Sequence, residues 1–172
     1  MVRENDRARR AGIVARLWTT GLLITCVMLA PALRPAAAAG SPVAIIVNSE
    51  TPVEELSLAE VRKILLGDRQ FWKTNIRVVL LVRAPVARER TVVLKTIYQM
   101  SEAQFRQYWI AKIFRAETTS GPKIVYSDQM TSELVSAIPG SIGFVDASNI
   151  QPGVKVLRVD GKLPGEKGYP LQ

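Results

Sequence analysis

The chain has 172 residues, of which 48% are hydrophobic and 22% are charged, so it is long enough for one packed domain, and wholesale disorder is excluded. Its formal net charge is +8, with 23 Lys and Arg against 15 Asp and Glu. It has no histidine and a single cysteine, Cys26, which excludes Ser/His/Asp and Cys/His nucleophile arrangements and most zinc or copper sites.

The first 39 residues have the pattern of a secretory signal. Several arginines precede an apolar stretch from Leu17 to Leu33, and Ala37-Ala38-Ala39 forms an A-x-A cleavage site before Gly40. We therefore divide the chain into a signal peptide, residues 1–39, and a periplasmic or secreted domain, residues 40–172. The alternative is an inner-membrane anchor formed by residues 17–33, whose length is at the lower limit for spanning a bilayer.

The charge of the remaining domain is mildly basic. Residues 1–39 hold six of the 23 basic and two of the 15 acidic residues, which leaves a net charge of +4 on residues 40–172. This charge suits an anionic ligand or an acidic partner, but it is too dispersed to indicate nucleic-acid binding. Cys26 would leave with the signal, so the core of the domain must hold without disulfides, which a domain of this size can manage.

Strands and helices alternate after Gly40. Apolar runs predict strands at 43–47, 76–82, 123–126, 141–145 and 154–159. Helices are predicted from Ser57 to Gly67, over 88–99, after Ser101 and over 128–138, and the pairs Ser57/Glu60 and Ser101/Gln104 are capping boxes. This order predicts an α/β domain with a mixed, mostly parallel sheet of about five strands and helices on both faces.

Two details of packing are predicted from residue spacing. Met130, Leu134 and Ile138 form one apolar stripe on the helix over 128–138. The aromatic residues could form a ligand platform, but their spacing favours the core: Phe71, Trp72, Phe105, Tyr108 and Trp109.

No pair of carboxylates is spaced for acid/base catalysis, so we expect no enzyme, no metal and no cofactor.

Two loops could bind an anion. In the first, Arg83 ends a strand and Arg88, Arg90 and Thr91 begin a helix, where free N–H groups and guanidinium groups favour phosphate or carboxylate; the alternative is a solvated helix face. The second loop, Glu117 to Lys123, contains Thr119, Ser120 and Gly121; the alternative is an ordinary surface turn.

Four segments occur in an order and spacing that resemble a known family: SLAEVRKILLGDRQFW, the strand ending at Arg83, IPGSIGFVD, and VKVLRVDGKLP followed by GYPL. From Val43 to Leu171 the chain resembles the second half of the phosphate-binding protein of ABC-type phosphate transporters, and more closely the short, single-lobe secreted proteins related to it. The resemblance implies one lobe of a type 2 periplasmic-binding fold, in which two lobes close on a ligand.

The resemblance also implies a site. In the family, an arginine followed four residues later by Ser-Gly-Thr holds phosphate, together with hydroxyls and an aspartate from the first lobe. Arg83 matches the arginine, whereas Ala87, Arg88 and Glu89 stand at the Ser-Gly-Thr positions, and the first lobe is not in this chain. The family's P-G-x-I-G-F/Y feature implies that Gly143 allows the neighbouring backbone to pack closely and that Ser141 lies near the mouth of the site.

The expected function is therefore solute binding, for phosphate or another oxyanion, in the context of ABC-type uptake with a permease or another envelope protein as partner. The alternative is an envelope protein-interaction module that has the same fold but no ligand.

Overall fold

The computed structural model describes residues 40–172. The expected signal peptide and its alternative as a membrane anchor lie outside the described residues. Within residues 40–172, no helix is long and apolar enough to cross a membrane.

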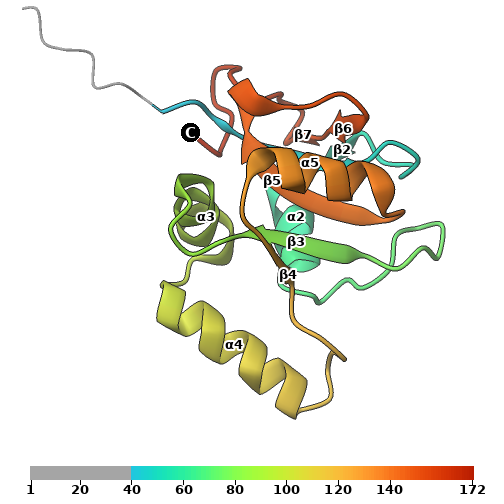
Figure 1. Cartoon of the computed structure of the whole chain (residues 1–172), viewed down its shortest axis with the longest axis vertical. Helices are drawn as coiled ribbons and strands as arrows, with labels where there is room; N and C mark the ends of the chain where they lie inside the picture. The colour runs from blue at the N-terminus through green and yellow to red at the C-terminus, as the bar shows by residue number, and fades with distance from the viewer. Residues whose placement is uncertain (1–39) are drawn as a thin grey trace, which may run out of the picture. The chain divides into compact units, whose positions relative to one another are not determined.

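The centre of the domain is a five-stranded sheet in the order β4-β3-β5-β1-β6 (Figure 1). The strands are β1 (Val43–Asn48), β3 (Val79–Arg83), β4 (Lys123–Val125), β5 (Ser141–Asp146) and β6 (Val154–Val156). β3 is parallel to both β4 and β5, and β1 is antiparallel to β5 and β6. Four of the five strands thus run in one direction and β1 opposes them, which confirms the mixed, mostly parallel sheet.

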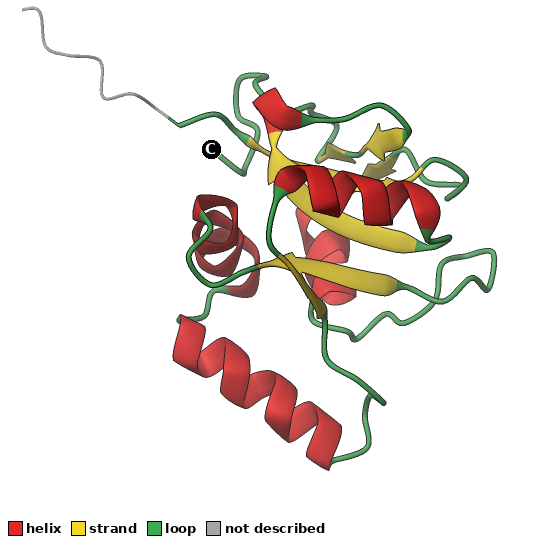
Figure 2. Ribbon diagram, in the orientation of Figure 1, coloured by secondary structure: helices red, strands yellow, loops and turns green. Residues whose placement is uncertain are grey.

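Helices cover both faces of this sheet (Figure 2). They are α2 (Leu58–Leu65), α3 (Arg88–Val93), its π-helical continuation η1 (Leu94–Tyr98), α4 (Glu102–Phe114), α5 (Asp128–Ala137) and the short 3₁₀ helix η2 (Ala147–Asn149). One buried cluster lies on the α2, α3 and α4 side and includes Ile45, Ile64 and Phe144. A second cluster lies under α5 and includes Ile46, Leu81 and Val135. The alternation of side chains along each strand therefore fills two apolar layers.

The ends of the helices follow the predicted signals. Ser57 and Glu60 at α2, and Ser101 and Gln104 at α4, form reciprocal capping boxes. Gly67 follows the last turn of α2 with a φ of 71°, a left-handed conformation that glycine adopts without steric cost. Local sequence thus determines where these two helices begin and where α2 ends.

The predicted strand over 154–159 is divided in two. Its second part, β7 (Arg158–Val159), leaves the main sheet and pairs in parallel with β2 (Glu55–Leu56) in a separate two-stranded sheet. The amide of Leu157 still donates to Ile45 O at 2.9 Å, whereas the amide of Arg158 donates to Glu54 O at 2.9 Å. The strand changes partners between these two residues, and the two-residue strand β2 was not predicted.

The predicted apolar stripe is not the buried face of α5, although Leu134 is partly buried and packs against the second cluster. The residues that α5 buries are Thr131, Ser132 and Val135, while Met130 is exposed. The cause is the short distance between α5 and β5. A Cβ at Gly143 would lie 2.9 Å from Thr131 Cγ2 and 3.4 Å from Val135 Cγ2. Gly143 therefore makes room for side chains of α5, and not for a neighbouring backbone as expected, and only small side chains fit between this helix and the sheet.

The aromatic residues mostly pack into the core, as their spacing predicted. Trp72, Phe105 and Trp109 are buried, and Tyr108 is half-buried with its hydroxyl donating to Leu66 O at 2.9 Å. Phe71 is exposed. No open aromatic platform exists on the part of the chain that the structure describes, but Trp109 also lines two cavities.

Candidate functional site

The structure places the eight predicted site residues in three separate regions. Four lie at the carboxyl end of β3 and on α3: Arg83, Arg88, Arg90 and Thr91. Three lie in the loop that leads into the amino end of β4: Thr119, Ser120 and Gly121. Ser141 begins β5 and pairs with Val79, the first residue of β3. Val79 and Arg83 are the first and last residues of β3, and four residues of a strand span about 13 Å. The two loops lie at these opposite ends of β3 and do not form one site.

Arg83 is enclosed by carboxylates. Its Nε lies 3.3 Å from Asp128 Oδ1 at the start of α5 and 3.7 Å from Glu89 Oε2 on α3, and all three side chains are almost buried. Nε and Nη1 of Arg83 make no hydrogen bond among the described residues. An added anion would therefore meet two nearby negative charges, which weaken its attraction to the guanidinium group.

The loop substitution seen in the sequence accounts for part of this arrangement. Where the family resemblance implies a threonine, the chain has Glu89, and the Glu89 carboxylate is one of the two groups against Arg83. The chain thus supplies its own carboxylate where the resemblance implies a hydroxyl for a bound anion.

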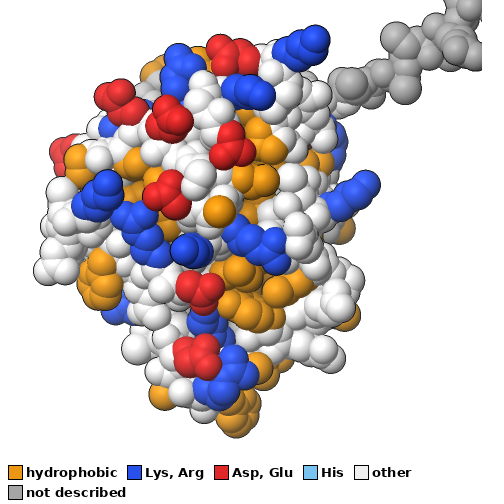
Figure 3. All heavy atoms as spheres, turned by 180° about the vertical axis from the view of Figure 1, so that it is seen from behind, with side chains coloured by type: hydrophobic (Ala, Val, Ile, Leu, Met, Phe, Trp, Pro, Cys, Tyr) orange, Lys and Arg blue, Asp and Glu red, His pale blue; other side chains and the backbone are white. Residues whose placement is uncertain are grey.

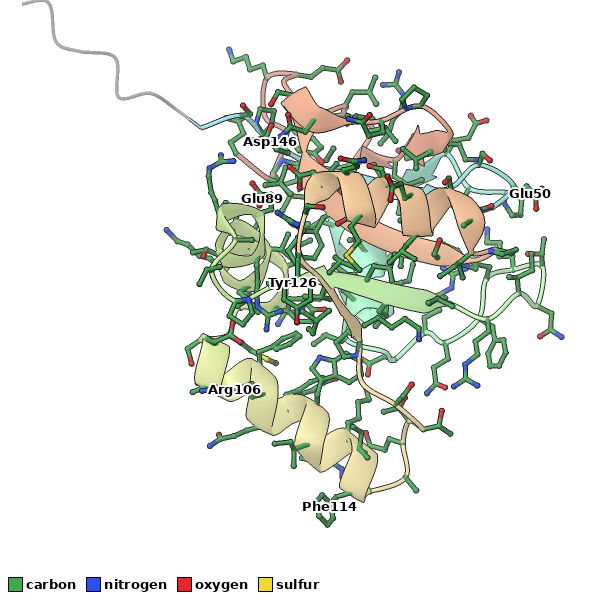
Figure 4. The ribbon with its side chains drawn as sticks, viewed as in Figure 1. Glu50, Glu89, Arg106, Phe114, Tyr126 and Asp146 are labelled. Carbon is green, nitrogen blue, oxygen red and sulfur yellow. The ribbon has the colours of Figure 1, made fainter. Side chains whose placement is uncertain are left out.

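The other arginines at this end of the sheet are also paired. Arg90 is buried and donates to Arg83 O at 2.7 Å and, with two nitrogens, to Glu102 at 2.7 and 2.9 Å. Arg88 lies 3.5 Å from Asp146 and donates to Ser41 O at 2.6 Å. Figure 4 labels Glu89 and Asp146 at this end of the sheet. Three arginines therefore face four carboxylates here, and the region has no excess of positive charge.

The pKa directions agree with this pairing. The hydrogen bonds from Arg90 hold the pKa of Glu102 below its ordinary value. Burial opposes ionisation of Asp146, but hydrogen bonds from Ser148 and Ser41 and the charge of Arg88 together hold its pKa below its ordinary value. These carboxyl groups are charged at neutral pH and compete with any external anion for the arginines.

Ser141 and Thr91 use their hydroxyls internally. The Ser141 side chain is buried, and its Oγ lies 2.6 Å from Ile138 O and 2.9 Å from Val135 O, so its one proton is donated to a carbonyl at the end of α5. Thr91 Oγ1 donates to Ala87 O at 3.4 Å. Ser141 lines none of the cavities described below.

The loop that contains Thr119, Ser120 and Gly121 lines a cavity of about 230 Å³. The cavity lies at the amino end of β3, between the end of α2, the middle of α4 and two loops, 69–78 and 118–121. Two contacts hold its walls in place. Gln70 Nε2 donates to Glu117 O at 2.8 Å, which joins the two loops. Lys112 Nζ donates to Leu66 O at 2.8 Å, which joins α4 to the end of α2.

Three cations line this cavity without a carboxylate partner. They are Arg69, Arg77 and Lys123, and none of them lies within 4.0 Å of an Asp or Glu oxygen in residues 40–172. Arg77 Nη2 donates to Thr119 Oγ1 at 2.9 Å. No acidic side chain is part of the lining, and Ser120 contributes a further hydroxyl, whereas the Thr118 hydroxyl donates to Ser120 O at 3.0 Å. This cavity therefore has the positive charge and the donors that the Arg83 end of the sheet lacks.

Other parts of the lining are apolar. They comprise Ile64 at the end of α2, Leu80 on β3 and Trp109 on α4. Trp109 Nε1 is buried and has no hydrogen-bond partner within the described part of the chain. A second, shallower hollow of about 350 Å³ lies on the other side of Trp109, and it is lined mainly by apolar side chains such as Phe105, Ile110 and Ile124.

The sequence predicted the loop around Ser120 as a candidate site, but Arg69 and Arg77 were not among the predicted site residues. Arg77 falls within the predicted strand over 76–82, but the strand begins at Val79, and Arg77 belongs to the loop before it. The signal that could have identified Arg77 is a basic residue just before a buried parallel strand. No group of three or more His, Cys, Asp or Glu residues within 40–172 is arranged to hold a metal ion.

Comparison with known proteins defines the class of fold. No protein-family model and no curated protein matches the sequence. Solved structures do match: the chain has the fold of one lobe of substrate-binding proteins of ABC transporters, as the family resemblance implied.

Three of these structures are from named bacteria. A protein from Clostridium perfringens, described as a phosphate ABC transporter substrate-binding protein and solved with bound phosphate, superposes with a TM-score of 0.62 at 19% identity over 76% of this chain and 52% of its own. PstS from Borrelia burgdorferi gives 0.60 at 18% identity, over 76% and 54% of the two chains. An ABC-type phosphate transport receptor from Vibrio cholerae gives 0.58 at 18% identity, over 72% and 48%. The chain thus spans about half the length of these structures.

Proposed function

We propose that this protein is an envelope solute-binding protein, not an enzyme, and that it holds a small oxyanion in the cavity lined by Arg77, Lys123 and Thr119. The observation that carries the proposal is the set of three cations, Arg69, Arg77 and Lys123, that line one cavity without a carboxylate partner. Free cations and hydroxyl donors around a cavity favour anion binding.

The charge distribution favours this cavity over the Arg83 end of the sheet. At Arg83, two carboxylates already lie within 4 Å of the guanidinium group. In the cavity an anion gains charge–charge attraction without having to displace an internal partner. On the face seen in Figure 3, a row of Lys and Arg side chains crosses the middle of the molecule, which would also attract anions to this protein.

The structural neighbours support the general role. Their names describe phosphate-binding proteins of ABC transporters, and this chain has the fold of one lobe of such proteins. We therefore propose phosphate or a related oxyanion as the solute and an ABC permease as a partner, in the periplasm or outside the cell after cleavage of residues 1–39 near Ala39.

A second candidate function is protein interaction, and a specific observation favours it. Large apolar side chains are exposed on α4, on the edge strand β4 and directly after β4: Ile110, Ile113, Phe114, Ile124 and Tyr126. Figure 4 shows Phe114 at the end of α4, pointing away from the sheet. Exposed apolar groups of this size are typical of interaction surfaces.

The test of the proposed function is a calorimetric titration of the purified protein with inorganic phosphate, with sulfate as a second oxyanion. We expect binding by the wild type and a loss of about fivefold or more in affinity for Arg77→Gln and for Lys123→Gln, because each removes a charged donor. Lys95→Gln is the control, since Lys95 is an exposed cation on η1, away from the cavity. Absence of heat with millimolar phosphate and sulfate, or an equal loss in the Lys95 variant, would overturn the proposal.

A further inference from the structure

The lining of the cavity at the amino end of β3 combines charged and apolar side chains. We propose that its ligand is a small organic oxyanion, a phosphate monoester or a carboxylate, that carries one apolar group. This inference rests on the proposed function, because it specifies the chemical class of the anion that the same cavity takes.

The two kinds of wall come from different elements. The polar side is formed by the two loops and the start of β4, with Arg69, Arg77, Thr119 and Lys123. The apolar side is formed by α2, β3 and α4, with Ile64, Leu80 and Trp109. A ligand that fills the cavity must therefore place a charged group against the loops and an apolar group against the helices.

A bare inorganic anion would use only half of this lining. Phosphate and sulfate are strongly hydrated, and a protein replaces their water only by surrounding them with donors. Here part of the lining is apolar, so an inorganic anion would have to keep part of its water, next to Leu80 and Trp109. An apolar substituent would release that water and bury its own surface, which strengthens binding in proportion to the area removed from water.

The size of the cavity limits the apolar group. Its volume of about 230 Å³ is below the range of about 300–1,000 Å³ that is common for small-molecule sites. A single ring or a short branched chain beside one charged group fits this space.

The aromatic wall adds a geometric preference. Trp109 is held in place by edge-to-face contacts with Phe105 and Tyr108, whose ring centroids lie 6.3 and 5.7 Å from its own. Gly67 contributes to the same wall, and a Cβ there would lie 2.8 Å from the far edge of the Trp109 ring. A fixed indole wall favours a planar apolar group, which makes an aryl phosphate or aryl carboxylate the best probe.

The experiment compares four probes by calorimetric titration of the full protein: inorganic phosphate, phenyl phosphate, benzoate and uncharged phenol. We expect phenyl phosphate to bind at least roughly tenfold more tightly than phosphate, because the ring buries apolar surface. Benzoate should also bind, and phenol should not bind at millimolar concentration, because it lacks the charge. The double variant Arg77→Gln/Lys123→Gln should weaken binding of phosphate, phenyl phosphate and benzoate, while Lys95→Gln should not.

The outcomes separate this inference from the proposed function. If phosphate binds as tightly as phenyl phosphate and the double variant weakens both, the inference is overturned and the proposed function stands. If no anion binds, or if the double variant binds every probe as the wild type does, both are overturned. Should the double variant fail to fold, as judged by far-ultraviolet circular dichroism, the ratio of phenyl phosphate to phosphate affinity in the wild type still decides the inference.

Discussion

At the scale of single residues, Arg83 balances two carboxylates in the interior. Glu89 and Asp128 come from different helices and lie on either side of its Nε, and all three side chains have only 10–12% of their surface exposed. Removing one member of a buried ion pair is costly, because the charge that remains loses its partner without regaining water. We therefore expect Arg83 to act on stability, by joining α3 and α5 at the end of β3.

The Arg83→Met variant tests this role. We expect it to lower the free energy of unfolding by about 3 kcal/mol, because two carboxylates remain in the interior without a counter-charge. Urea unfolding at neutral pH measures the change. Arg88→Met is the control, since Arg88 is far more exposed and its surface ion pair with Asp146 contributes about 1 kcal/mol or less. Equal costs for the two variants would contradict this account of Arg83.

The individual charges could be read from the sequence, but their pairing could not. Arg83, Arg88 and Arg90 cluster within eight residues and suggest a free basic loop. Their partners Asp128, Asp146 and Glu102 lie far along the chain and reach the arginines only after the helices pack. Arg77 and Lys123 give no stronger signal in the sequence, yet neither has an acidic partner within residues 40–172.

At the scale of elements, Arg90 and Glu102 join α3 to the first turn of α4. The two charge-assisted hydrogen bonds measure 2.7 and 2.9 Å, and the guanidinium group of Arg90 also lies 4.7 Å from the centre of the Phe105 ring. Phe105 packs against Tyr98 at the end of η1, with ring centroids 4.9 Å apart. This cluster determines how α4 is held beside the rest of the helical layer.

The ion pair between Arg90 and Glu102 predicts that stability depends on pH. The pKa of Glu102 lies below its ordinary value of 4.5 because Arg90 donates hydrogen bonds to its charged form. A lowered pKa in the folded state means that this contribution to stability is complete above about pH 4.5 and is lost as the pH falls through the lower, folded-state value. We expect Glu102→Gln to lower the melting temperature at pH 7, and the difference from the wild type to shrink as the pH falls below 4.5.

Melting temperatures measured from pH 7 down to pH 3 check this expectation. Glu133→Gln serves as the control, because Glu133 is an exposed carboxylate on α5 with no cation partner among the described residues. A difference between Glu102→Gln and the wild type that stays constant over this range would mean that ionisation of Glu102 does not contribute to the α3–α4 link.

Elements whose signals are local could be predicted. The capping boxes at Ser57 and Ser101 and the glycine after α2 gave the helix ends, because each acts within one turn. The buried face of α5 could not be predicted, since it depends on how closely Gly143 lets this helix approach β5. The pair β2 and β7 was missed for a related reason: each strand has two residues and exists only through the other.

At the scale of the whole molecule, the order and direction of the strands decide which residues can act together. The sequence predicts two loops suited to an anion, but it does not specify that β3 and β4 are parallel neighbours. With that pairing, Arg83 and the loop around Ser120 lie at opposite ends of the two strands. The same topology brings Arg77, before β3, to the loop before β4, where it bonds to Thr119. Which residues line the cavity is therefore decided by how the strands pair in the folded sheet.

The measurement that tests the central claim most directly is an amide NMR titration of the ¹⁵N-labelled protein with inorganic phosphate. It reports the position of binding without any substitution. We predict that chemical-shift changes saturate and concentrate on residues 69–78 and 118–123, which surround the cavity. Saturating changes concentrated instead on residues 83–91 and at Asp128 would place the anion at Arg83 and contradict the account.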